Sequence, residues 1–216
     1  MITEWGYYGR HELTSKVKQI ITENKYSAVD VGASIYFWSY PECKAVIDSI
    51  PVGGEDTTFI KADLNNLQDL QRIEREILAT KQFDFSICSH TLEDIYNPLQ
   101  LIEFLPKISK RGYIAMPSKF DEFRIHREGF IRGYAHHKTI FDIKDNTVVL
   151  FPKYTFIEKD SRSDILASMN GPSDLVFFWE ESIPATIFQS GIVSTSDEAL
   201  ITSFYNGLIP DTNGTI

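Results

Sequence analysis

Cysteine is scarce in this sequence: only Cys43 and Cys88 occur in 216 residues, and they do not form a C-x-x-C spacing. Neither a disulfide framework nor a cysteine zinc site is indicated, so we expect two buried free thiols. Long apolar runs are also missing, because no stretch approaches the roughly 20 apolar residues that span a bilayer. The N-terminus has no basic segment followed by an apolar one. We therefore expect a soluble, cytoplasmic protein without a membrane partner.

Basic residues are outnumbered: 21 Lys and Arg stand against 30 Asp and Glu, for a formal net charge of −9. Binding to a phosphate backbone needs clustered cations, so this balance argues against nucleic acid as a partner. The chain is 43% hydrophobic and 13% aromatic, which is enough for one sizeable core. We expect residues 1–216 to form a single domain.

Short apolar runs alternate with helical patterns through the first half of the chain. The runs at 27–32, 44–48, 57–63, 83–89 and 112–118 predict strands. Apolar residues at helical spacing predict helices over 10–24, after Asn65 or Asn66, and after Asn97 and Pro98. Pro106 should kink or end the last of these helices early. This alternation predicts an α/β fold: a Rossmann-like open sheet of mostly parallel strands with helices on both faces.

The pattern changes after residue 118. Residues 144–146, "KDN", separate two β-branched runs and predict a C-terminal antiparallel hairpin, which we expect to finish the sheet. We place the core of the domain at about 25–155. Residues 158–174 are rich in Asp, Ser, Asn, Gly and Pro and predict a loop or lid, and 175–216 form a C-terminal extension.

Chemistry is expected where the parallel strands end, because open α/β sheets bind ligands outside their carboxyl ends. Gly32 ends the first predicted strand, Asp48 the second and Asp63 the third, while Ser89 and His90 end the fourth. Asp48 is placed to accept both hydroxyls of a ribose, or equally to be a turn or cap residue. The G-x-G-x-x-G pattern is absent, which disfavours a dinucleotide enzyme.

The series "VDVGAS", "VID", "IKADLNNL" and "FDFSICSHTLEDIYNPLQLIEFLPKISKRGYIAMPS" resembles the class I S-adenosylmethionine-dependent methyltransferases of the type 11 kind, over residues 25–118. It departs from the family in its degenerate glycine motif, where Ala33 and Ser34 follow Gly32. The resemblance implies that the protein binds S-adenosylmethionine. It also implies a set of cofactor-binding residues: Asp30, Gly32, Ala33, Ser34, Asp48, Asp63, Leu64, Ser89 and His90.

The segment 119–141 gathers positive charge in an otherwise acidic chain. Arg127 and Arg132 are the residues that we expect to orient a small, polar or anionic acceptor. A solvated, charged surface loop is the alternative.

His136 and His137 are candidates for a general base, with His90 as third choice, because an imidazole pKa near 6.5 suits proton removal. Adjacent residues on a strand point to opposite faces, so we expect no metal site at this pair. A structural histidine that hydrogen-bonds to the backbone is the alternative reading.

These observations favour methyl transfer to a small-molecule acceptor. A protein of the same fold that has lost catalysis and serves in binding is the second hypothesis, since Trp5, Tyr7, Tyr8, Tyr36, Phe37 and Trp38 are suited to filling a vacant cleft or forming a homodimer. A metal-dependent hydrolase using the histidines and Asp142 is a third.

Overall fold

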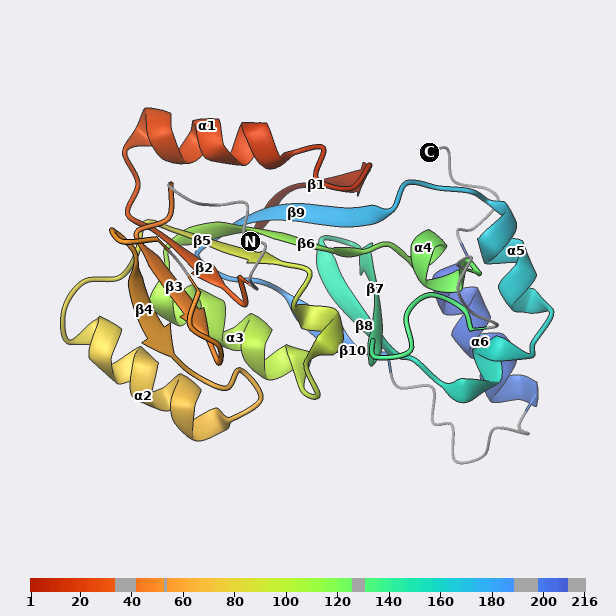
Figure 1. Ribbon diagram of the computed structural model, residues 1–216. Coiled ribbons are helices and arrows are strands. Elements are labelled where there is room, and N and C mark those ends of the chain that lie inside the picture. Colours follow the sequence, from red (N-terminus) through yellow and green to blue (C-terminus); the bar gives the residue numbers. More distant parts are fainter. Residues whose placement is uncertain (34–41, 53, 126–130, 189–197, 210–216) are drawn as a thin grey trace.

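The chain folds around a seven-stranded sheet and a smaller three-stranded one. The computed structural model describes residues 1–33, 42–52, 54–125, 131–188 and 198–209 (Figure 1). The main sheet has the order β1-β9-β6-β5-β2-β3-β4. Its strands are β1 (Ile2–Tyr8), β2 (Ala28–Val31), β3 (Ala45–Asp48), β4 (Thr58–Lys61), β5 (Phe85–Ser89), β6 (Arg111–Pro117) and β9 (Asp174–Glu180).

Strand order reverses at β2, which pairs in parallel with β3 on one side and with β5 on the other. The β3–β4 and β5–β6 pairs are parallel as well. β9 is antiparallel to both of its neighbours, β6 and β1. The parallel part therefore has the doubly wound arrangement, in which the crevice beside the reversal point is the usual ligand position.

Helices cover both faces of this sheet (Figure 1). Helix α1 (Thr14–Asn24) buries Val17 and Ile21 in one cluster with Ala28 of β2. Helices α2 (Leu67–Leu78) and α3 (Pro98–Ile108) share the other cluster with Val29 and Val31. Successive residues of β2 thus face opposite layers, as the pleat of a strand requires. The expected Rossmann-like α/β sheet is confirmed.

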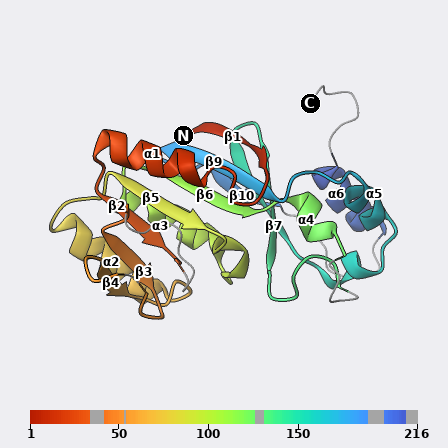
Figure 2. The ribbon, with the colours of Figure 1, turned by 45° about the horizontal axis from the view of Figure 1, so that its top comes forward.

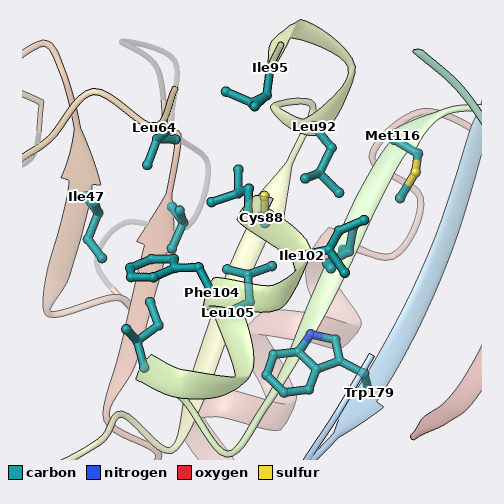
Figure 3. Close-up of a cluster of buried hydrophobic side chains, with 14 of the residues drawn as sticks. Ile47, Leu64, Cys88, Leu92, Ile95, Ile102, Phe104, Leu105, Met116 and Trp179 are labelled. Carbon is teal, nitrogen blue, oxygen red and sulfur yellow. The ribbon is translucent and has the colours of Figure 1, made fainter. Parts of the chain in front are cut away.

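The cluster beneath α3 is the larger core. Figure 3 shows Ile102, Phe104 and Leu105 of this helix near Cys88 of β5 and Trp179 of β9. Cys43 and Cys88 are buried thiols that form no disulfide, as expected.

The predicted caps of the second-layer helices form. The Asn66 side chain accepts a hydrogen bond from the Gln68 amide, and that of Asn97 accepts one from the Gln100 amide. Pro106 lies in the last turn of α3, which continues to Ile108. Its missing amide therefore costs at most one bond of that turn, and the helix does not end at the proline.

The predicted hairpin is present, but it belongs to the second sheet. β7 (Thr139–Lys144) and β8 (Thr147–Pro152) are antiparallel, with Asp145 and Asn146 at positive φ in the turn between them. β10 (Ala185–Ile187) pairs in parallel with β8. The expectation that this hairpin finishes the main sheet is wrong, because the antiparallel strand there is β9.

The second sheet packs with three further helices, α4 (Lys119–Phe123), α5 (Arg162–Ser168) and α6 (Glu198–Leu208) (Figures 1 and 2). Ile157, Leu166 and Phe204 lie in their common core. The stretch 158–174, expected as a loop or lid, therefore contains a packed helix. Its polar residues include Ser163, which is buried and donates a hydrogen bond to the Ile157 carbonyl. None of the described helices is long and apolar enough to cross a bilayer.

A buried ion pair joins the two sheets. The Lys119 ammonium donates to Asp142 at 2.7 Å, and the Tyr7 hydroxyl donates to the other oxygen of that carboxylate at 2.6 Å. Both charged side chains are buried. The three groups come from α4, β7 and β1, so one polar contact links both sheets and a helix.

Candidate functional site

The candidate site lies along the edge where the parallel strands end. Gly32 follows β2, Asp48 ends β3 and Ser89 ends β5. Because β9 runs in the opposite direction, it begins at this same edge, where Asp174 pairs with Pro117 of β6 and with Tyr8 of β1. An acid from a distant segment thereby joins the predicted residues.

Position 32 requires glycine for two reasons, the backbone conformation and the close approach of Thr91. The φ of Gly32 is +77°, and a Cβ at this position would lie 2.3 Å from the Thr91 methyl carbon. The Thr91 hydroxyl donates to the Gly32 carbonyl at 3.0 Å. The turn after β2 is thus held directly against the turn after β5.

His90 lies between two buried acids. Its Nε2 is 3.2 Å from Asp174, and its Nδ1 is 3.3 Å from Glu93. The backbone reaches this position at a φ of +53°, uncommon for a residue with a side chain. His11, which follows β1, packs edge to face on the His90 ring at 5.8 Å between centroids.

The two acids determine the protonation of His90. Burial alone would lower its pKa, but the hydrogen bond to Asp174 and the contact with Glu93 outweigh it and raise the pKa to about 9. Burial and the neighbouring His90 lower the pKa of His11. His90 is therefore a cation at neutral pH, and it does not suit the role of general base.

The two carboxylates beside His90 outnumber the single positive charge of its imidazolium. Among the described residues, one oxygen of Glu93 and one of Asp174 are buried without a hydrogen-bond partner. Burial raises the pKa of the Cys88 thiol, and the carboxylates of Asp30 and Glu93 raise it further. Two acids thus lie beside one imidazolium, and buried carboxylate oxygens without a partner are costly unless a donor or cation meets them.

The other predicted cofactor residues are spread along the edge. The Asp48 carboxylate accepts hydrogen bonds from the Ile50 amide at 3.0 Å and the Ser49 hydroxyl at 3.3 Å. Asp63 is exposed and accepts from the Asn65 amide.

Three predicted cofactor residues are largely enclosed by protein. Leu64 belongs to the main core (Figure 3), and Asp30 and Ala33 are buried. Ser34 lies outside the described residues.

A hollow of about 600 Å³ lies at the β4 end of this edge. Ser49 and Asp63 line it together with Lys61, Arg72 and other side chains of β4 and α2.

His136 and His137 lie in the segment that precedes β7. Their rings are 4.6 Å apart, and both approach Asp94 of the short helix η1 (Leu92–Asp94). The expectation that the two side chains point to opposite faces is wrong, because it assumed a strand. Asp142, proposed with them in a hydrolase, is instead paired with Lys119.

Arg132 is buried, and its hydrogen-bond partners lie around the helices that pack with the three-stranded sheet. Its guanidinium donates to Asp164 at 2.6 Å and to the Phe123 carbonyl at 3.1 Å. Lys119 and Arg124 pair with acids as well. Most of the positive charge expected for an anionic acceptor is therefore neutralised within the protein, and Arg127 lies outside the described residues.

The aromatic residues of the N-terminal strand are divided between the core and the surface. Tyr7 packs on the main core and Tyr8 on the cluster under α1, while Trp5 is 41% exposed. Tyr36, Phe37 and Trp38 lie outside the described residues.

Sequence reasoning missed Glu93, Thr91, Asp174 and His11. Glu93 and Thr91 were within reach, because they follow His90 in the segment that carries the resemblance. Asp174 and His11 carry no local signal, since their place depends on β1 and β9 adding to the far side of the sheet.

No family model matches the sequence, and no curated protein matches it. Solved structures with a similar arrangement include the MycE methyltransferase from the mycinamycin biosynthetic pathway in complex with Mg and SAH, at 15% identity and a TM-score of 0.38. The match covers 51% of this chain and 34% of MycE, so the chain spans about a third of that relative.

Two further structures match over more of their length. The N-terminal domain of EvdMO1, solved with SAH and D-fucose, shows 11% identity and a TM-score of 0.40, covering 79% of this chain and 83% of that one. An S-adenosylmethionine-dependent methyltransferase from Mesorhizobium loti shows 16% identity and a TM-score of 0.35, covering 82% and 73%. Since these TM-scores are below 0.5, the fold assignment rests on the strand order of this chain.

Proposed function

We propose that the protein binds S-adenosylmethionine at the carboxyl edge of its main sheet, between β2 and β5, and transfers the methyl group to a small polar acceptor. The observation that carries the proposal is the excess of buried carboxylates around His90, with one oxygen each of Glu93 and Asp174 unpartnered among the described residues. S-adenosylmethionine carries an ammonium and a sulfonium, so its charge complements such an edge.

The neighbouring residues would hold the rest of the cofactor. Asp48 lies one strand away from Gly32 in the sheet, at the carboxyl end of β3. A carboxylate at this position suits the two hydroxyls of a ribose. Asp63, in the hollow at the β4 end, would then lie toward the adenine.

Methyl transfer breaks the bond from carbon to the sulfonium and forms one to the acceptor, which then releases a proton. The sulfur leaves as a neutral thioether. The main contribution of the protein would be to hold the acceptor atom in line with the methyl group. Because His90 is protonated at neutral pH, we assign the proton to solvent or to His136 or His137.

The acceptor that we propose is polar. An anionic acceptor would have to compete with Asp164 for Arg132.

A second candidate function is binding without catalysis. It is favoured by the contact between Thr91 and Gly32, which accounts for the glycine without any cofactor. The two candidates differ in whether the edge still accepts S-adenosylmethionine.

Calorimetric titration with S-adenosylhomocysteine, the product of methyl transfer, tests the proposal. We expect micromolar binding, on the order of 8 kcal/mol, that weakens at least tenfold in Asp48→Ala. Asp145→Ala, an exposed acid in the β7–β8 turn, is the matched control and should bind as the unchanged protein does. Absence of binding by folded protein would reject the proposal and favour the second candidate.

A further inference from the structure

Two histidines and an aspartate converge at the junction of the two sheets. The Nε2 atom of His136 is 3.7 Å from an Asp94 oxygen, and that of His137 is 4.0 Å from the same oxygen. One ligand atom from each of the three residues lies within 4.8 Å of the other two. His136 and Asp94 are exposed, whereas the His137 side chain is 7% exposed.

The backbone holds this arrangement in place. The Lys138 amide donates to the Glu93 carbonyl at 2.7 Å, which ties the segment that carries the histidines to η1. The Lys138 carbonyl accepts from the Lys153 amide at 3.0 Å. The Tyr134 ring packs on both imidazoles, with its centroid 4.7 Å from that of His137. The convergence is therefore anchored by contacts outside the three side chains.

A buried carboxylate fixes the orientation of His137. Its Nδ1 contacts Glu122, whose side chain is 1% exposed and whose other oxygen accepts from Lys153 at 2.7 Å. With Nδ1 as the donor to Glu122, the lone pair of His137 is on Nε2, directed toward Asp94. A carboxylate behind an imidazole is the usual support of a metal-binding histidine.

The spacing fits a metal ion after a small contraction. Zn²⁺ binds imidazole nitrogen at about 2.0–2.1 Å, so neighbouring tetrahedral ligands are roughly 3.3 Å apart. The two distances to Asp94 exceed this value by less than 1 Å, and the two imidazoles have ligand atoms within 4.8 Å of each other. His136 and Asp94 are exposed, so rotation of their side chains is the movement that would close the difference.

We infer that Asp94, His136 and His137 bind one divalent transition-metal ion of the Zn²⁺ class, with Glu122 positioning His137. Two imidazoles and one carboxylate favour zinc or its first-row neighbours over Mg²⁺ and Ca²⁺, which prefer oxygen ligands. Three protein ligands leave at least one coordination position open to solvent or a small molecule. The ion would also link η1 to the segment before β7. While the ion is bound, the Nε2 lone pairs of His136 and His137 could not accept a proton.

Zn²⁺ binding to the full chain, stripped with a chelator and titrated by calorimetry without cofactor, tests this inference. We expect one ion per chain at micromolar affinity or tighter, and at least tenfold weaker binding in His136→Ala and in Asp94→Asn. Both substitutions are at exposed positions and should leave the fold intact, which circular dichroism checks. Mg²⁺ at the same concentration should give no comparable binding.

Two controls separate this site from adventitious binding. His11→Ala and Asp145→Asn remove exposed residues of the same types elsewhere and should not change the affinity. Glu122→Gln should weaken binding roughly 10- to 100-fold while the stoichiometry stays at one. Equal affinity in His136→Ala and the unchanged protein, or no binding by folded protein, would overturn the inference. Because no cofactor is present, neither outcome depends on methyl transfer.

Discussion

At the scale of single residues, His90 is unusual in three respects. Its imidazole is 14% exposed, lies between Asp174 and Glu93, and has a backbone at positive φ. Strained and buried titratable groups gather at functional sites more often than elsewhere. His90 is therefore the residue at the carboxyl edge where an unusual backbone conformation and a buried charge cluster coincide.

The raised pKa of His90 predicts that stability depends on pH in the alkaline range. The folded-state pKa of about 9 exceeds the unfolded value near 6.5, so the stabilisation is complete below pH 6.5 and is lost as pH rises through 9. We expect the free energy of unfolding to fall by about 2–3 kcal/mol between pH 7 and pH 10 because of this group. Urea unfolding at both pH values measures the change, and His90→Gln should reduce it.

Nuclear magnetic resonance titration of the imidazole gives an independent check on the folded protein. A midpoint near 9 is the expected result, whereas a midpoint at or below 6.5 would contradict the ion-pair account of this cluster.

At the scale of elements, the turns after β2 and β5 act as one unit. Thr91 lies against Gly32, and its hydroxyl donates to the Gly32 carbonyl, with the Ser89 carbonyl at 3.3 Å. The backbone at Gly32 lies in the left-handed region, which costs about 1–3 kcal/mol for a residue with a side chain.

Gly32→Ala should therefore destabilise the protein by about 3 kcal/mol, since overpacking against Thr91 adds to the backbone strain. Gly9→Ala is the matched control: its added Cβ meets only the end of the Glu12 side chain, at 3.2 Å. Denaturant unfolding of both variants measures the difference. A loss in Gly32→Ala no larger than that in Gly9→Ala would show that the turn relaxes freely.

Elements with local signals were predictable. The strands β2 to β6 and the helices α1 to α3 follow from apolar periodicity, and the caps Asn66 and Asn97 from the residue types that satisfy a helix N-terminus. The hairpin followed from its turn residues, Asp145 and Asn146, which tolerate positive φ.

Elements with non-local partners were not predictable. β9 begins at Asp174 and inserts between β6 and β1, and nothing in its apolar run "DLVFFWE" states its direction or its neighbours. The histidine pair was misjudged for a related reason: a strand was assumed where the chain turns against η1. The contact of both Glu93 and Asp174 with His90 is therefore visible only in the three-dimensional structure.

At the scale of the whole molecule, the contact of Lys119, Asp142 and Tyr7 connects the two sheets. A buried charge that loses its partner is costly, whereas an apolar pair of similar volume is often tolerated. This contact should decide whether the seven-stranded sheet and the three-stranded sheet unfold together.

Asp142→Leu should destabilise the protein by about 3–5 kcal/mol, because it leaves the Lys119 ammonium buried and unpaired. The double variant Lys119→Met, Asp142→Leu should recover a large part of that loss, and a double-mutant cycle by denaturant unfolding measures the coupling. Lys144→Met with Asp145→Leu, at exposed positions of the β7–β8 turn, is the control and should show little coupling. Additive effects at the buried pair would contradict its role as the link.

The central claim is that the carboxyl edge at the strand reversal is the ligand site. Hydrogen–deuterium exchange with and without S-adenosylhomocysteine tests it most directly, because the method locates the response along the chain. We predict slower exchange in peptides that cover 28–33, 46–50 and 87–94, and no change in the hairpin at 139–152. Unchanged exchange along the whole chain, or protection confined to other segments, would contradict the claim.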